Sequence, residues 1–328
     1  MGVRQLIYER GNGKSFRTYL LVLCSLTTLA SNFTTIQYST RPAPLFHSSL
    51  VPFAERHGHI CPKCGNKTYY KTISRRHSLL ECQSCGHQES PINGTAFENS
   101  KLPLVKIFLA CFFLAETKSS VSAVLLAQYI SISVKTARNL LRKLRTIMIE
   151  ADSHYKLSGN IVIDEGFFGA PKSGKRGRGS GKIKALFAVQ YQPYKGHNIP
   201  MFLSVVKIPD FTGSTFKAFA DEKITSGSVL LSDGFPTYNS LSKNYTVIST
   251  TDAPDDETSP LKLVHLFISN AKAMFQGTFH GLGAKRVQGY FSEFTYRFNR
   301  RDSKTPVVEH LLRSCVREGY TSVPALCI

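Results

Sequence analysis

The stretch Ile161-Val162-Ile163-Asp164, a short apolar run that ends in an aspartate, decides the fold class of this chain. Comparable runs, rich in β-branched and aromatic residues and typical of strands, recur along the sequence. They lie at 185–191, 201–206 and 229–231. Helical periodicity returns at 261–275 and 287–298. Strands followed by helices within one stretch of chain predict an α/β domain, a mixed sheet flanked by helices.

Two helices before these strands form a candidate helix-turn-helix. We expect the first over 121–130, with Ser119 or Ser120 as its N-cap, and the second over 134–148. A longer apolar helix that begins near Lys101 precedes both. A helical hairpin with a solvated basic face has the same pattern, so this segment alone leaves both interpretations open. The cations of the second helix, which could reach a DNA groove, are Lys135, Arg138, Arg142, Lys143 and Arg145.

Two pairs of cysteines predict a metal site. Cys61-Pro-Lys-Cys64 and Cys82-Gln-Ser-Cys85 are CxxC turns, and four thiolates at this spacing are typical of a zinc ribbon. A module of this size has too little apolar surface to fold without metal, so the expected role of Zn²⁺ is structural. Four unligated cysteines are the alternative. Paired thiols in a long chain favour metal ligation over disulfides, and therefore a reducing compartment.

The composition favours a polyanionic partner. The 328 residues include 41 Lys and Arg against 22 Asp and Glu, a formal net charge of +19, and such a surplus suits nucleic acid. A hydrophobic content of 42% supports two or three folded domains and excludes a disordered chain.

Residues 19–30 are apolar but too short to span a bilayer, so we expect no membrane association. We interpret residues 1–54 as a variable leader and linker, with a signal peptide as the alternative.

Two aspartates follow two of the expected strands and could share a metal ion. Asp164 ends the run 161–163, and Asp233 follows the run 229–232. Carboxylates at neighbouring strand ends can hold Mg²⁺ or Mn²⁺, and a two-metal site can activate an attacking oxygen and stabilise a leaving one. Aspartates are also common turn residues, so the pattern alone leaves a structural role open.

Several motifs in a fixed order carry a family resemblance. Besides the CxxC turns they are Ser90-Pro-Ile-Asn-Gly94-Thr95-Ala-Phe97, Lys135-Thr136-Ala137, Ile163-Asp164-Glu165-Gly166-Phe-Phe-Gly169, Ser232-Asp233-Gly234, the stretch 265–280 and Glu293-Phe-Thr-Tyr-Arg297-Phe298-Asn299-Arg300-Arg301. Together they resemble the DDE-type insertion-sequence transposases with an N-terminal zinc ribbon, insertion-sequence family 1595, over residues 55–302. The resemblance implies an RNase H-like catalytic fold, two-metal chemistry and the inverted repeats of a mobile element as substrate.

The resemblance also implies which residues hold the catalytic metal ions. Asp164 and Asp233 look like the first and second carboxylates. The third family residue precedes a lysine by seven positions, and counting back from Lys272 gives His265. Glu, Asn and His all occur there in the family, so His265 is expected to be a natural variant. Seven residues are two helical turns, which puts His265 and Lys272 on one helix face.

Other assignments of the third position stay open. Asn270 is the rival residue, and His265 could instead be a hydrogen-bonded core histidine. As a metal ligand, histidine is softer than a carboxylate and would favour Mn²⁺. The acids that a shifted alignment would select are Glu165, Glu257 and Glu293.

Two further groups of cations are candidate DNA contacts. A glycine-rich basic loop could hold a phosphate backbone without reading its sequence, although a solvated loop is the alternative. Its cations are Lys172, Lys175, Arg176, Arg178, Lys182 and Lys184. Arg297, Arg300 and Arg301 lie at the end of the last expected helix, whose aromatic residues favour packing.

These observations divide the chain into five parts. We expect a variable leader and linker at 1–54, a zinc ribbon at 55–94, a helical DNA-binding domain at 95–157, an RNase H-like catalytic domain at 158–302 and a C-terminal tail at 303–328.

The expected function is that of a transposase that binds the terminal inverted repeats of an insertion sequence, cleaves double-stranded DNA with Mg²⁺ or Mn²⁺ and transfers the strand. The alternatives are a DNA-binding regulator with a decayed catalytic domain and a nuclease without strand transfer, and His265 in place of a carboxylate keeps the first of them open. The resemblance implies a homo-oligomer, because two ends must meet. It also implies a location in the cytoplasm or nucleoid, or in the nucleus of a eukaryote.

Overall fold

The computed structural model describes residues 60–73, 78–90, 92–117, 119–169, 182–250, 259–279 and 283–316. The chain divides into two compact units, Met1–Asn93 and Gly94–Ile328. Within the described ranges, no helix is both long enough and apolar enough to cross a lipid bilayer.

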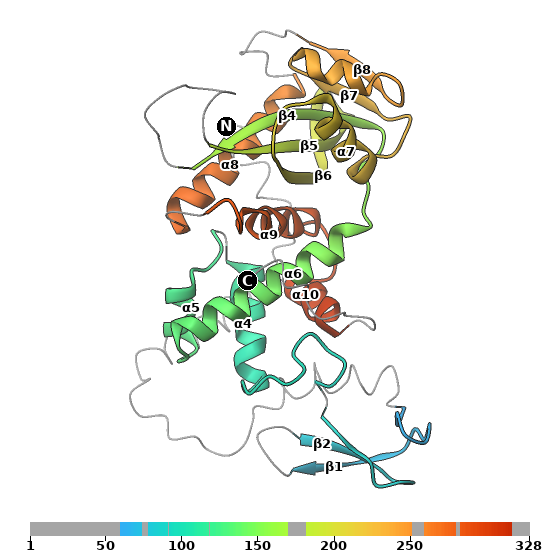
Figure 1. The fold of residues 1–328 in the computed structure, drawn as a ribbon, viewed down its shortest axis with the longest axis vertical. Helices are drawn as coiled ribbons and strands as arrows, with labels where there is room; N and C mark the ends of the chain where they lie inside the picture. Colours follow the sequence, from blue (N-terminus) through green and yellow to red (C-terminus); the bar gives the residue numbers. More distant parts are fainter. Residues whose placement is uncertain are drawn as a thin grey trace. The chain divides into compact units, whose positions relative to one another are not determined.

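The first unit contains a small antiparallel sheet in the order β1-β2-β3 (Figure 1). β1 (Tyr69–Ile73) pairs with β2 (Ser78–Cys82), and β2 pairs with the short β3 (Gln88–Glu89). One CxxC turn precedes β1 and the other follows β2. Because the pairing sets Tyr69 opposite Cys82, the start of β1 lies beside the end of β2, and the two turns come together.

In the second unit, four helices share a hydrophobic core. They are α4 (Leu104–Glu116), α5 (Ala123–Tyr129), α6 (Val134–Ser153) and α10 (Val307–Val316). α10 belongs to the segment from which the sequence indicated only a tail. Its fully buried Leu311 and Cys315 pack into this core, so the described part of that segment stabilises the helical bundle.

The candidate helix-turn-helix begins two residues later than expected. The side chain of Ser122, rather than Ser119 or Ser120, accepts a hydrogen bond of 3.2 Å from the backbone N–H of Leu125 and caps α5. Ser133 caps α6 in the same way, through a hydrogen bond of 3.1 Å from the N–H of Thr136. Serine is a favoured N-cap because its oxygen satisfies one of the free amides of the first turn.

The central sheet of the second unit has the strand order β6-β5-β4-β7-β8. β4 (Asn160–Phe168) runs antiparallel to β5 (Ile183–Tyr194), which runs antiparallel to β6 (His197–Ile208). On its other side β4 pairs in parallel with β7 (Val229–Ser232), and β7 pairs in parallel with β8 (Thr246–Ser249). The RNase H-like mixed sheet expected from the sequence is confirmed.

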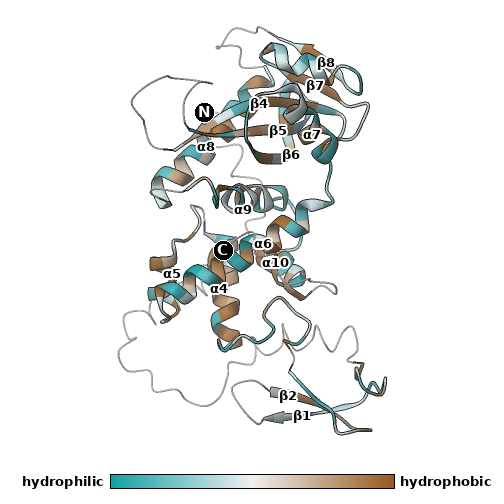
Figure 2. Cartoon of the chain, in the orientation of Figure 1, coloured by the Kyte–Doolittle hydropathy of each residue, from teal (hydrophilic) through white to brown (hydrophobic). Residues whose placement is uncertain are grey.

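Helices cover both faces of this sheet (Figure 1). The odd-numbered residues of β4 pack with α7 (Gly213–Lys223) and the 3-10 helix η2 (Pro236–Leu241), and the even-numbered ones pack with α8 (Leu261–Thr278) and α9 (Val287–Asn299). This alternation follows from the two-residue period of a strand. In Figure 2 the middle of β4 and β5 is hydrophobic, as burial on both faces requires.

The sequence did not indicate β8 or α7. β8 is only four residues long and mostly exposed, so it lacks the apolar run of a buried strand. α7 carries a usable signal, because its buried Phe216, Phe219 and Ala220 have the three- and four-residue spacing of an amphipathic helix.

Candidate active site and metal centre

The first site aspartate, Asp164, lies in the middle of the central strand β4. It is only 8% exposed, and one carboxylate oxygen accepts a hydrogen bond of 2.7 Å from the backbone N–H of Glu165. Position 166, directly after Glu165, requires glycine, because a Cβ at Gly166 would come within 2.8 Å of the rings of Phe168 and Phe187. The Asp164-Glu165-Gly166 motif therefore fits the aromatic packing of this part of the sheet.

The second aspartate, Asp233, follows the end of the neighbouring strand β7 and is exposed. Its carboxylate accepts a hydrogen bond of 3.2 Å from the N–H of Phe235, which forms a tight turn. Gly234 in this turn has φ +84°, and a Cβ there would lie 2.7 Å from the Ser249 hydroxyl of β8. Both the backbone conformation and the close approach of β8 require glycine at this position.

The structure brings three carboxylates together at this edge of β4 and β7. One ligand atom each from Asp164, Glu165 and Asp233 lies within 4.8 Å of the other two. Oxygen ligands at this spacing suit a hard divalent cation such as Mg²⁺ or Mn²⁺. Glu165 was indicated by the sequence only as a fallback acid, although its place directly after Asp164 is the signal that could have identified it.

His265 reaches the same place from helix α8. Its Nε2 lies 3.2 Å from a carboxylate oxygen of Asp164, and 59% of its side chain is exposed, so it is not a core histidine. The hydrogen bond to Asp164 raises the pKa of His265 against the effect of partial burial, and the negative charges of Asp164 and Asp233 add to this rise. His265 therefore borders the carboxylate cluster.

Lys272 and Asn270 are both exposed on the same helix but differ in direction. Lys272 is close enough for its positive charge to oppose the rise in the pKa of His265. At 3.6 residues per turn, Lys272 is rotated by about 20° from His265 and Asn270 by about 140°. The helix therefore directs Lys272, and not Asn270, to the side of His265. Of the other rival acids, Glu257 lies outside the described residues.

Glu293 is excluded from the site by its own contacts. It is fully buried on α9, where a carboxylate oxygen accepts a hydrogen bond of 2.8 Å from Nε of Arg145 on α6. The guanidinium of Arg145 also stacks at 3.9 Å on the ring of Tyr290. Arg145 is thus not on the exposed basic face of α6, where the sequence pattern had put it.

The four cysteines of the first unit converge. The sulfur atoms of Cys61 and Cys85 are 3.6 Å apart, and those of Cys64 and Cys82 are 3.5 Å apart. A tetrahedral zinc site with Zn–S bonds of about 2.3 Å has sulfurs about 3.8 Å apart, so the four thiols fit such an ion. Backbone N–H groups of Cys85 and Ser84 lower the pKa of Cys82 to about 6, whereas hydrogen bonds with the neighbouring cysteines raise the pKa of Cys64.

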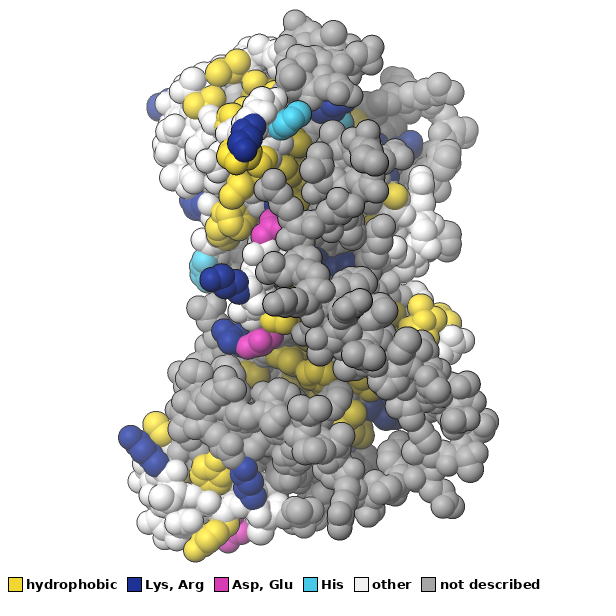
Figure 3. Space-filling model, turned by 180° about the vertical axis from the view of Figure 1, so that it is seen from behind, with side chains coloured by type: hydrophobic (Ala, Val, Ile, Leu, Met, Phe, Trp, Pro, Cys, Tyr) yellow, Lys and Arg dark blue, Asp and Glu magenta, His cyan; other side chains and the backbone are white. Residues whose placement is uncertain are grey.

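The candidate DNA contacts fall into different environments. Lys135 and Arg138 are exposed on α6, and Arg142 is partly buried there. Lys182 is partly buried just before β5. In the space-filling view, Lys and Arg side chains appear at several places along the face shown, whereas Asp and Glu are sparse (Figure 3). The loop cations outside the described residues are Lys172, Lys175, Arg176 and Arg178.

Arg300 and Arg301 are already engaged within the protein. Arg300 forms an ion pair of 2.8 Å with Asp152 of α6 and stacks at 3.5 Å on the ring of Tyr296. Arg301 donates hydrogen bonds to the backbone carbonyls of Met201 and Pro200 at the start of β6. These contacts give both side chains a structural role, and their contact with DNA stays a prediction.

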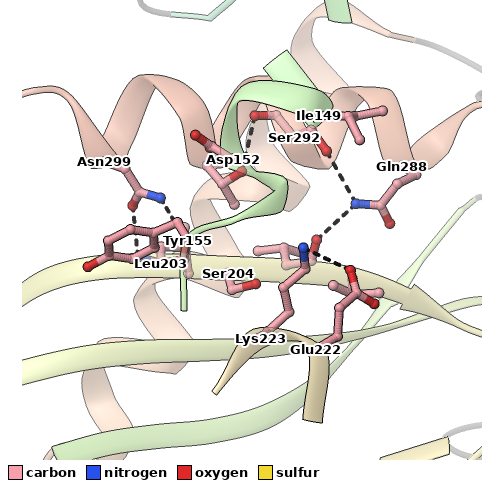
Figure 4. Close-up of a pocket in the computed structure, with 13 residues that line it drawn as sticks. Ile149, Asp152, Tyr155, Leu203, Ser204, Glu222, Lys223, Gln288, Ser292 and Asn299 are labelled. Atoms are coloured by element: carbon pink, nitrogen blue, oxygen red, sulfur yellow. Dashed lines mark hydrogen bonds and ion pairs between the residues drawn. The ribbon is translucent and has the colours of Figure 1, made fainter. Parts of the chain in front are cut away.

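The described cavity in the second unit lies away from this site. It has a volume of about 200 Å³ and lies beside the edge strand β6, between α9 and the end of α6 (Figure 4). Among its lining residues are Asp152, Tyr155, Val205, Gln288, Ser292 and Asn299. None of Asp164, Glu165, Asp233 and His265 lines it.

Comparisons with known proteins give one family match. The model of the ISXO2-like transposase domain matches residues 156–299, which contain all of Asp164, Asp233, His265 and Lys272. No curated protein matches the chain. Among solved structures, the Mos1 mariner paired end complex with Mn is 12% identical, with 95% of this chain and 99% of that chain covered and a TM-score of 0.21. A likeness at this level carries no argument about this chain.

Proposed function

Residues 156–299 form an ISXO2-like transposase domain, the family indicated by the sequence motifs, and from this premise we propose that the chain cleaves and rejoins DNA at the ends of an insertion sequence. The observation that carries the proposal is the approach of Asp164, Glu165 and Asp233 to within 4.8 Å of one another inside that domain. Three carboxylates this close repel one another, and a divalent cation between them relieves the repulsion.

We propose that Asp164 and Asp233 hold the ions and that His265 takes the third position through Nε2. Bound Mg²⁺ or Mn²⁺ would supply charge stabilisation for the attacking and leaving oxygens of the phosphodiester. The hydrogen bond between Asp164 and His265 orients both groups before DNA arrives, and Lys272 on the same helix face is placed to contact a phosphate oxygen.

In the first unit, Cys61, Cys64, Cys82 and Cys85 would hold a structural Zn²⁺. Without the ion, a three-stranded sheet of this size has little else to stabilise it. Double-stranded DNA is the proposed partner, held by the exposed cations of α6 and by the basic loop after β4. Because two ends must be cut and joined together, we propose that the chain acts as a homo-oligomer on DNA, in the cytoplasm or nucleoid, or in the nucleus of a eukaryote.

The proposal is tested by a cleavage assay with DNA that carries the sequences flanking the reading frame, in the presence of Mg²⁺ or Mn²⁺. Asp164→Asn and Asp233→Asn should each lower end cleavage by about 100-fold or more, because each removes a metal-binding charge. Asp221→Asn is the matched control, since Asp221 is exposed on α7. Full cleavage by either site variant contradicts the assignment.

The same assay separates the other functions. Wild-type protein that binds the ends without metal-dependent nicking supports the regulator. Nicked ends without joined products support the nuclease, and joined products support the transposase.

A further inference from the structure

The helices α6 and α9 run side by side in the same direction and meet at a regular spacing. Arg145 pairs with Glu293 at 2.8 Å, and Asp152 pairs with Arg300 at 2.8 Å. The contact moves forward by seven residues on each helix between the two pairs. Because seven residues are two helical turns, the same faces meet again at each step.

Seven residues before the Arg145–Glu293 pair, the same spacing leads to Arg138 on α6 and to Arg286, the residue that precedes α9. At the two later positions of the contact between α6 and α9, the paired residues have opposite charges. At the position of Arg138 and Arg286, both residues are positively charged. Arg142 lies one turn after Arg138 on α6, on the side of this position. The helix spacing, together with the electrostatic effect of Arg138 and Arg286 on Arg142, puts these three arginines in one region at the start of α9.

In the part of the chain that the structure describes, no carboxylate is paired with these arginines. Burial lowers the pKa of Arg142, and the positive charges of Arg286 and Arg138 lower it further, against an opposing effect of Tyr290. Among the described residues, none of the three arginines has an ion pair. Like charges held together in this way cost free energy unless an anion binds between them.

We propose that Arg138, Arg142 and Arg286 form a binding site for one phosphate group of the DNA backbone. Arg286 is the new member, contributed by the transposase domain itself. Guanidinium groups suit this ligand because they donate paired hydrogen bonds to phosphate oxygens. The inference rests on the proposed function, since it takes DNA as the partner.

The site has a consequence for how DNA is held. A phosphate bound there contacts α6 and the start of α9 together, and the buried Arg145–Glu293 pair one step further fixes these helices to each other. DNA that binds on α6 is thus held in a defined position relative to the sheet that carries Asp164.

The test is the salt dependence of duplex DNA binding by the full chain, measured by fluorescence anisotropy between 50 and 200 mM salt. Each neutralised phosphate contributes about 0.9 to the slope of log K against log salt. Arg286→Gln should lower the slope by about that amount. Between the lowest and the highest salt concentration, the DNA affinity of the variant should therefore fall by a factor about threefold smaller than that of the wild type. Arg313→Gln removes the same charge from the exposed pair with Glu309 and should leave the slope unchanged.

A double variant tests whether the arginines share one phosphate. Arg138→Gln with Arg286→Gln should lower the slope no further than Arg286→Gln alone, and a second decrease of similar size overturns the shared site. The Tm of Arg286→Gln without DNA should not fall, because the change relieves repulsion, and a clear decrease in Tm indicates a structural role instead.

The controls also separate this inference from the proposed function. Wild-type protein that does not bind duplex DNA overturns both. Normal wild-type binding with Arg286→Gln indistinguishable from Arg313→Gln overturns the phosphate site alone.

Discussion

Nε of Arg145 donates a hydrogen bond of 2.8 Å to the carboxylate of Glu293, and the two side chains are only 6% and 0% exposed. The pair joins α6 of the helical bundle to α9, which packs on the sheet. The ring of Tyr290 covers the guanidinium, and the carboxylate also lies 3.9 Å from Arg297. A residue that the sequence assigned to a DNA-facing surface and one kept as a spare catalytic acid thus form a buried structural contact.

We expect Glu293→Gln to destabilise the second unit by about 3–5 kcal/mol, because Arg145 would keep a buried charge without its partner. Replacing both residues, Arg145→Met with Glu293→Met, should recover most of that loss. Urea unfolding followed by circular dichroism measures both. Glu309→Gln breaks an exposed pair with Arg313 and should cost less than about 1 kcal/mol. A Glu293→Gln variant as stable as this control contradicts the argument.

Arg145 also shows where the sequence could and could not predict the structure. Strand and helix periods predicted β4 to β7 of the central sheet and the helices α8 and α9, but not β8 or α7, because burial imposes those periods directly only on well-buried elements. The spacing of apolar residues in α6 could not show that its polar side also packs against α9. That contact joins Arg145 to Glu293, which is 148 positions away in the sequence. The same limit applies to Glu165, which a strand directs to the opposite face from Asp164 and which still reaches the carboxylate cluster through its longer side chain.

Removal of metal should unfold the first unit and leave the second folded. We expect about one Zn²⁺ per purified chain and its loss in Cys82→Ser, because three remaining thiols leave the tetrahedron incomplete. Metal analysis gives the stoichiometry, and limited proteolysis after chelation should cut within residues 60–90 first. Cys111→Ser is the control, since Cys111 is buried in α4. Retention of zinc by Cys82→Ser contradicts the predicted ligand set.

The third catalytic position can be tested by restoring a carboxylate. His265→Ala should lower end cleavage by about 100-fold, because it removes the proposed metal ligand and the contact with Asp164. His265→Glu should retain cleavage in Mg²⁺, since a carboxylate supplies a harder donor at the same place. Asn270→Ala should behave like wild type, because Asn270 points to another side of α8. Loss of cleavage in Asn270→Ala together with normal cleavage in His265→Ala reverses the assignment.

Glu165 should contribute to metal affinity. Glu165→Gln keeps the shape of the side chain but removes the charge next to Asp164 and Asp233. We expect the metal concentration for half-maximal cleavage to rise about 10- to 100-fold, the range found when groups that support a metal site are changed. A titration with Mn²⁺ measures it, with Glu222→Gln on the exposed surface of α7 as the control. An unchanged titration curve excludes Glu165 from the metal site.

The edge of the sheet gives the last prediction, and it concerns solubility as well as stability. The Asn299 amide accepts a hydrogen bond of 2.8 Å from the N–H of Leu203 and donates one of 2.9 Å to its carbonyl. Gln288 does the same for the carbonyl of Val205 and the N–H of Lys207, at 3.1 and 2.8 Å. Figure 4 shows Asn299 and Gln288 reaching β6 from α9. Because β6 is an edge strand, these side chains take the place of a further strand.

Asn299→Leu should therefore leave the N–H and carbonyl of Leu203 without partners, at a cost of about 1–3 kcal/mol, and open the edge to pairing with another chain. Asn299→Asp can still accept from the N–H but repels the carbonyl, so it should be similarly unstable although it is more polar. Urea unfolding and light scattering at increasing protein concentration measure the two effects. Asn239→Leu, at an exposed position of η2, controls for added surface hydrophobicity. If Asn299→Leu aggregates no more than Asn239→Leu, α9 does not protect this edge, and its amides only fix the position of the helix.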